Sequence, residues 1–167
     1  CMDVARRHGL KVKALMSMGH PGEDGQTIAD TRSWLLDVRP DDLDVTIITC
    51  YPGTPYYDYA VKHPEKDGVW IYTCEKTGDR LYELEVDYTK VADYYKGDPD
   101  GGYQAYVYTD ALSADALVAA RNALERDVRV ALNIPFNPAA SAVRYEHSMG
   151  QLGSGLPANI VRASPGR

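Results

Sequence analysis

The chain of 167 residues lacks the cysteine spacings, the basic excess and the long apolar runs that mark several classes of protein. Cys1, Cys50 and Cys74 have no Cys-x-x-Cys spacing, so they form neither a disulfide framework nor a metal knuckle, and they suit a reducing cytoplasm. With 18 basic against 24 acidic side chains and a net charge of −6, the chain is not expected to bind nucleic acid. No apolar segment reaches the roughly 20 residues that cross a bilayer, so we expect no membrane partner.

Several catalytic and ligand-binding motifs are absent as well. Gly19, Gly22 and Gly25 lack the Gly-x-Gly-x-x-Gly spacing of dinucleotide-binding folds, and no Gly-Lys-Ser follows them. A hydrolase is disfavoured because no Gly-x-Ser-x-Gly elbow occurs. The four histidines share no metal-ligand spacing, so the sequence predicts no metal site of its own.

The first third of the chain contains a strand–helix–strand pattern. The apolar run over residues 11–19 predicts a buried strand, and the β-branched run over 42–50 predicts a second one. Between them, Asp24 or Thr27 caps a helix that Pro40 ends. This βαβ unit implies two parallel strands joined by a right-handed crossover.

The remainder of the chain follows a different pattern. Two β-type runs flank residues 76–79 and predict an antiparallel hairpin, and Ser113 is expected to cap an amphipathic helix. The glycine- and aspartate-rich stretch 94–103 and the tail after residue 133 are expected to be loops.

Tyrosine dominates the aromatic residues, with 13 Tyr against one Phe and two Trp. Of these tyrosines, 11 lie between residues 56 and 108, which indicates a half-exposed surface or a cleft wall. Tyrosine is enriched at the cores of protein interfaces. One hypothesis for function is therefore a non-catalytic domain that binds a partner through this surface.

Two Pro-Gly turns follow the two expected parallel strands, in the stretches SMGHPGEDGQT and CYPGTPYYDY. In parallel α/β sheets, ligands bind beyond the carboxyl ends of the strands. There, Gly19 and Gly22 would let the backbone approach a ligand closely, and Pro21 would stiffen the turn. Glu23 is expected to accept N–H groups at the start of the helix. The residues alone leave a second interpretation open, a rigid turn and a capped helix without any ligand.

The ordered pair of turns resembles the later barrel strands of radical S-adenosylmethionine (SAM) enzymes, where Gly-x-Pro-Gly-Glu and Pro-Gly-Thr-Pro follow successive strands. The resemblance covers roughly residues 1–62 and is greatest to cobalamin-binding members, including methyltransferases. It implies an α/β fold, the carboxyl-terminal portion of a partial (β/α)6 barrel with the antiparallel hairpin and helix as an extension. It further implies that the chain is part of an enzyme that uses a 4Fe-4S cluster to cleave SAM to a 5′-deoxyadenosyl radical. Where cobalamin is bound, the resemblance implies that the reaction is a methyl transfer or a rearrangement.

The same resemblance implies site residues at the two turns. Those implied to bind the cofactor are Met16, Met18, Gly19, Pro21, Gly22, Glu23, Tyr51 and Pro52. Cys50 ends the second strand and would be the catalytic residue, a hydrogen-atom donor or radical site; the alternative is a buried, inert thiol. His20, inside the first turn, is a further candidate against an ordinary surface residue.

One departure from the family is the absence of its Cys-x3-Cys-x2-Cys loop, which binds the cluster. We therefore expect the cluster ligands to lie outside this chain and the chain alone to be inactive. Residues 1–10 resemble the last turns of a helix, so residue 1 is not expected to be a natural start, and the missing amino-terminal half of the barrel is an expected partner. The expected parts are barrel units over 1–65, a Tyr-rich extension over 66–132 that selects a small-molecule or peptide substrate, and a tail over 133–167.

Overall fold

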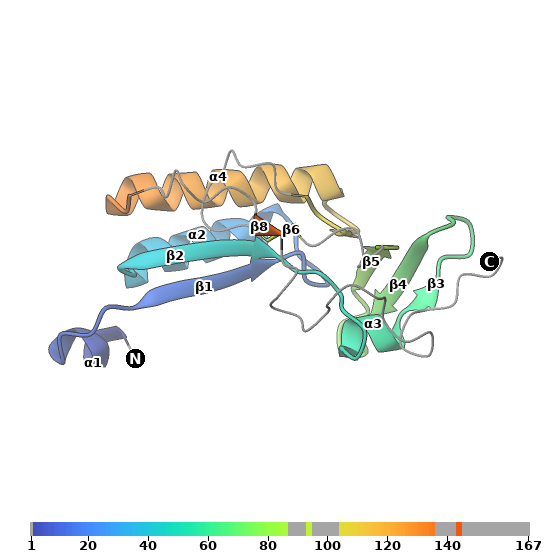
Figure 1. Cartoon of the computed structure of the whole chain (residues 1–167), viewed down its shortest axis with the longest axis horizontal. Coiled ribbons are helices and arrows are strands. Elements are labelled where there is room, and N and C mark those ends of the chain that lie inside the picture. Colours follow the sequence, from blue (N-terminus) through green and yellow to red (C-terminus); the bar gives the residue numbers. More distant parts are fainter. Residues whose placement is uncertain (1, 87–92, 95–103, 136–142, 145–167) are drawn as a thin grey trace.

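The computed structural model describes residues 2–86, 93–94, 104–135 and 143–144, which form a mixed α/β structure (Figure 1). Its helices are α1 (Met2–Arg7), α2 (Gly25–Val38), α3 (Pro55–Tyr59) and α4 (Ala114–Leu132). Its strands are β1 (Lys13–Met18), β2 (Asp42–Ile47), β3 (Val61–Lys62), β4 (Val69–Thr73), β5 (Arg80–Leu84), β6 (Asp93–Tyr94), β7 (Val107–Thr109) and β8 (Val143–Arg144). Within these ranges the strands close no barrel, and no helix is long and apolar enough to cross a membrane.

The expected strand–helix–strand unit is confirmed. β1 and β2 run parallel, with Met18 opposite Ile47, and α2 connects them. Asp24 caps α2 through its side chain, while the Thr27 hydroxyl accepts the N–H of Asp24 in return. This reciprocal capping box fixes where the helix begins. The helix ends at Val38, two residues before Pro40.

Helices α2 and α4 cover the same face of the parallel sheet (Figure 1). On this face Met18 and Val45 are buried and pack in one core with Leu35 of α2 and Leu124 of α4. Side chains alternate between the two faces of a strand. Leu15, on the opposite face, is 75% exposed. The expectation of a buried strand is therefore wrong for this face of β1.

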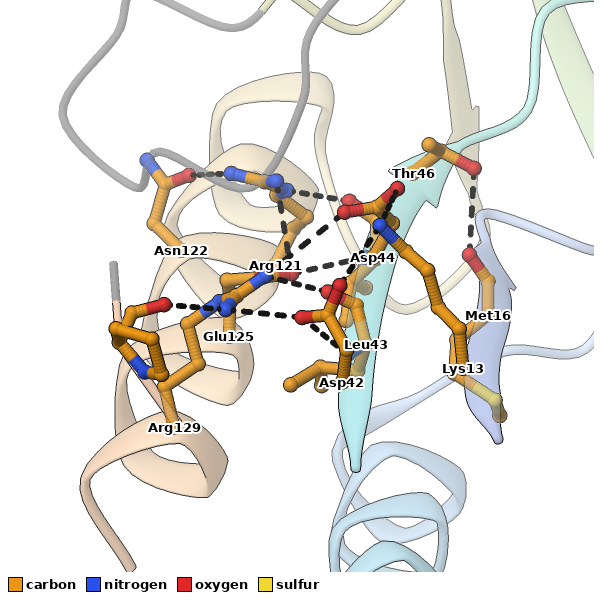
Figure 2. A network of polar contacts seen from close by, with 12 residues as sticks. Lys13, Met16, Asp42, Leu43, Asp44, Thr46, Arg121, Asn122, Glu125 and Arg129 are labelled. Atoms are coloured by element: carbon orange, nitrogen blue, oxygen red, sulfur yellow. Dashed lines mark hydrogen bonds and ion pairs between the residues drawn. The ribbon is translucent and has the colours of Figure 1, made fainter. Parts of the chain in front are cut away.

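The outer edge of β2, the one turned away from β1, is covered by charged side chains of α4 rather than by a third strand (Figure 2). The Nε of Arg121 donates to the carbonyl of Val45 at 2.7 Å, and the Val45 N–H donates to Glu125 Oε2 at 2.8 Å. Arg129 donates to the carbonyl of Leu43 and to Glu125. These three side chains, the α4 triad, thus satisfy backbone groups that a neighbouring strand would otherwise bond.

Further charges complete this network at the side of the sheet. Arg129 Nη1 lies 3.2 Å from Asp42 Oδ1. Lys13 Nζ, on β1, lies 3.0 Å from Asp42 Oδ2 and 2.9 Å from Asp44 Oδ2. Among the described residues, the network joins three basic and three acidic side chains: Lys13, Arg121, Arg129, Asp42, Asp44 and Glu125. Buried charges cost free energy unless they are paired, so this balance allows Glu125 to be fully buried.

The expected hairpin is confirmed as β4 and β5, and it belongs to a four-stranded antiparallel sheet in the order β3-β4-β5-β7. β3 and β7 were not predicted, because two or three residues are too few to show an alternating pattern. Leu81 of β5 and Val107 of β7 are fully buried in the same core as Met18 and Leu117. One core therefore spans both sides of the expected boundary after residue 65.

The helix expected after Ser113 is confirmed, since the Ser113 hydroxyl accepts the Ala116 N–H at 3.2 Å and α4 begins at Ala114. Most of the expected loop over 94–103 and most of the tail lie outside the described residues.

Replacing Glu125 tests how much the α4 triad stabilises the fold. Glu125→Ala removes a fully buried acid that pairs with Arg129 and with the Val45 N–H, so it should lower the free energy of unfolding by about 3–5 kcal/mol. Asp127→Ala on the same helix removes a half-exposed partner of Arg32 and should cost no more than about 1 kcal/mol. Urea unfolding followed by circular dichroism measures both, and equal losses would contradict the role of the triad.

The outer edge of β1 carries no strand among the described residues, and open edges favour pairing between molecules. We expect self-association that rises with protein concentration and that Leu15→Lys reduces by placing a charge on β1. Leu10→Lys is the matched control, because Leu10 is also exposed but precedes the strand. Size-exclusion chromatography with light scattering measures the mass; a monomer at every concentration would contradict the expectation.

Candidate functional site

The two Pro-Gly turns leave the parallel sheet at the same end, where β1 and β2 finish. Gly19, Gly22 and Gly53 have φ angles of +87°, +82° and +86°, a region that side chains other than hydrogen disfavour. The Glu23 carboxylate accepts the N–H of Gly19 and so closes the first turn on itself. The contact expected between Glu23 and the helix start is replaced by the Asp24 cap.

The antiparallel sheet packs directly on the first turn. A Cβ placed on Gly19 would lie 3.0 Å from a methyl group of Val107 in β7. A Cβ on Gly22 would lie 2.7 Å from the carboxylate of Asp79, in the hairpin turn. The chain's own residues, Val107 and Asp79, therefore occupy the space beside both glycines, where the sequence had predicted a ligand.

His20 joins the first turn to the second. Its Nε2 lies 2.8 Å from the Ser17 hydroxyl at the end of β1, and its Nδ1 lies 3.2 Å from the Tyr56 hydroxyl in α3. The two rings meet edge to face, with centroids 6.0 Å apart. Both imidazole nitrogens thus have a hydroxyl partner, and these contacts connect the end of β1 with α3.

Tyr56 also packs against a second tyrosine, in the antiparallel sheet. Its ring centroid is 4.7 Å from that of Tyr72 in β4. Burial raises the pKa of Tyr56, and the electrostatic effect of Tyr72, Cys50 and Cys74 raises it further. The Tyr56 hydroxyl therefore stays protonated at neutral pH.

The structure places the expected site residues in two different environments. Met18 is 1% exposed in the core, and Met16 packs against that core, so both lie on the face that the helices cover. Cys50 is buried in the same core and forms no disulfide bond with another described residue. The residues that remain partly exposed at the turns are Pro21, Glu23, Tyr51 and Pro52, together with the exposed Gly22.

Sequence reasoning missed Ser17, Tyr56 and Tyr72 as members of this site. Ser17 stands three residues before His20 in the first Pro-Gly turn, and Tyr56 belongs to the second, so both are part of the two motifs. The missing information was the long-range contact, because 36 positions separate His20 from Tyr56.

The described residues contain no group of three His, Cys, Asp or Glu side chains that could hold a metal ion. Cys50 and Cys74 are the cysteines among these residues, and they are not joined in a disulfide. An iron–sulfur cluster needs several thiolates that converge on one point. These residues therefore do not fit a 4Fe-4S cluster.

A second aromatic cluster lies on the other face of the antiparallel sheet. Tyr82 and Tyr108 are stacked, with centroids 4.5 Å apart and an interplanar angle of 2°. The Tyr82 hydroxyl donates to Asp110, and Arg80 binds the same carboxylate through two hydrogen bonds. Tyr82 is only 8% exposed, whereas Tyr59 is 74% exposed. The tyrosine-rich region is thus partly a packed cluster and partly an open surface.

Substituting the glycines separates backbone strain from packing. Gly78→Ala, at φ +79° with no atom within 4 Å of the new Cβ, should cost about 1–2 kcal/mol of unfolding free energy from strain alone. Gly19→Ala adds a clash with Val107 in the core and should cost about 1–3 kcal/mol more. Thermal and urea unfolding give both values; equal losses would mean that β7 does not press on the turn.

Comparisons with protein-family models, with curated proteins and with solved structures find no match for this chain. The resemblance of the two turns to radical SAM enzymes therefore rests on their own residues and spacing.

Proposed function

We propose that this chain is the carboxyl-terminal part of a radical SAM enzyme and that its two Pro-Gly turns form one wall of the cofactor site. The observation that carries this proposal is that both motif turns follow adjacent parallel strands and meet at one end of the sheet. His20 links them through its contact with Tyr56. A site at the carboxyl ends of parallel strands is where α/β folds bind ligands.

In this role the chain supplies positioning rather than cluster chemistry. Bound SAM and its cluster would supply the 5′-deoxyadenosyl radical, and cobalamin, where present, would serve methyl transfer or rearrangement. The turn from Gly19 to Glu23 offers backbone groups in a fixed conformation, because the Glu23 carboxylate holds the Gly19 N–H. Tyr51 and Pro52 offer partly exposed surface beside it. The cluster ligands come from elsewhere, as the described residues do not fit them.

The open edge of β1 gives the proposed barrel a point of continuation. In a (β/α)6 barrel every inner strand pairs on both sides. β2 already has its outer edge covered by the α4 triad, whereas β1 has no described neighbour on its outer edge. A preceding parallel strand from the amino-terminal half of the barrel would pair there, and the small-molecule or peptide substrate would meet the antiparallel sheet beside the turn.

A second candidate is a non-catalytic domain that binds a partner protein through its tyrosines. It is favoured by one observation: the spaces beside Gly19 and Gly22 are filled by Val107 and Asp79. On this reading the turns only join the two sheets, and exposed residues such as Tyr59 make the partner contact.

Titration of the isotope-labelled chain with S-adenosylhomocysteine, observed by NMR, distinguishes the cofactor-site proposal from the partner-binding proposal. The first proposal expects amide shifts confined to residues 17–23 and 50–52. Glu23→Gln should reduce these shifts, because the neutral amide holds the Gly19 N–H less strongly. Glu75→Gln, in the hairpin turn, is the matched control and should leave them unchanged.

Two outcomes would contradict the enzyme proposal. One is the absence of shifts at millimolar ligand, and the other is shifts located only on the antiparallel sheet. Anaerobic iron–sulfur reconstitution adds an independent check. A cluster that forms on this chain alone would overturn the view that its ligands lie elsewhere.

A further inference from the structure

The hydrogen-bonded pair of Tyr56 and His20 has a geometry suited to moving a proton together with an electron. The Tyr56 hydroxyl is 3.2 Å from His20 Nδ1, and His20 Nε2 is 2.8 Å from the Ser17 hydroxyl. A neutral imidazole has one acceptor nitrogen and one donor nitrogen. When Nδ1 accepts from the phenol, Nε2 carries the hydrogen and donates it to Ser17, so every polar hydrogen of the pair has a partner.

The surroundings of Tyr56 keep its phenol neutral until it is oxidised. Burial, first of all, raises the pKa of the hydroxyl, and Tyr72 packs its ring 4.7 Å away. Loss of an electron turns a neutral phenol into a strong acid, so the proton has to leave in the same step. His20 Nδ1 is the base within hydrogen-bond distance.

We propose that Tyr56 is a redox-active tyrosine and that His20 is its proton acceptor. In the oxidising step, one electron leaves the Tyr56 phenol for a strong one-electron oxidant. The phenolic proton moves to His20 Nδ1, which gives a neutral phenoxyl radical and an imidazolium while the oxidant is reduced by one electron. When the electron returns, Nδ1 gives the proton back and the starting pair is restored. This property does not depend on SAM binding.

Tyr82 supplies an internal contrast. Its hydroxyl donates to Asp110 at 2.9 Å, so it also has a hydrogen-bond acceptor. However, the hydrogen bonds from Arg80 hold the pKa of Asp110 below its usual range. That carboxylate is a much weaker base than an imidazole. The two tyrosines thus share a hydrogen-bonded phenol but differ in the strength of the acceptor.

Flash photolysis with a photogenerated ruthenium(III) tris-bipyridine oxidant tests the proposal on the chain as it stands. Transient absorption of the phenoxyl radical should show a fast phase that Tyr56→Phe removes and Tyr82→Phe retains. His20→Gln keeps a hydrogen-bond acceptor near the phenol but cannot take the proton. It should slow the fast phase by about 100-fold or more, which is the lower end of what a positioned proton acceptor contributes. Deuterated solvent should slow the wild-type phase and have less effect on His20→Gln.

Controls keep this test independent of folding. Circular dichroism and thermal unfolding establish that each variant is folded. If His20→Gln does not fold, Ser17→Ala removes only the Nε2 partner and should slow the phase to a smaller extent. A fast phase that survives Tyr56→Phe, or a rate unchanged in both His20→Gln and Ser17→Ala, would overturn the proposal. Because no SAM is present, this result is distinct from any failure of the ligand titration.

Discussion

The described fold depends on how the backbone groups at the outer edge of β2 are hydrogen-bonded. The N–H and carbonyl of Val45 bond to Glu125 and Arg121, side chains of one helix, instead of to a strand. This fixes α4 alongside β2. Since α4 follows β7 after four residues, it also draws the antiparallel sheet against the ends of β1 and β2. The Thr109 hydroxyl then donates to the Glu23 carbonyl at 2.8 Å, which ties β7 to the first turn.

The candidate site is a consequence of this arrangement. The turn that ends β1 is held from inside by the Glu23 carboxylate and from outside by β7 and the hairpin. Rigid backbone at the end of a parallel sheet suits a ligand site, and it also suits a plain joint between two sheets. What goes beyond a joint is the His20–Tyr56 pair, because polar side chains from three separate elements meet there with both imidazole nitrogens engaged.

Local patterns in the sequence were enough to predict the parallel pair, the α2 and α4 caps and the β4–β5 hairpin, since each depends on neighbouring residues. The α4 triad was not predicted, because charged residues at helical spacing normally indicate a solvated face. Arg121, Glu125 and Arg129 recur every four residues and lie beside the buried positions Leu117 and Leu124. The spacing alone does not show that this charged stripe of the helix is buried as well. The sequence predicted that Gly19 lets the backbone be approached closely, but it could not predict that the approaching residue is Val107, which lies 88 positions away.

The two outer edges of the parallel sheet differ in whether their backbone hydrogen-bonding groups are covered. On β2 the hydrogen-bonding groups of Val45 are consumed by side chains of the same molecule, and no further chain can add there without displacing a buried carboxylate. The outer edge of β1 has no comparable cover of side chains or strands among the described residues. Any strand that extends the parallel sheet therefore has to pair with β1, because the outer edge of β2 is already bonded by α4. The sheet can be enlarged on one side only.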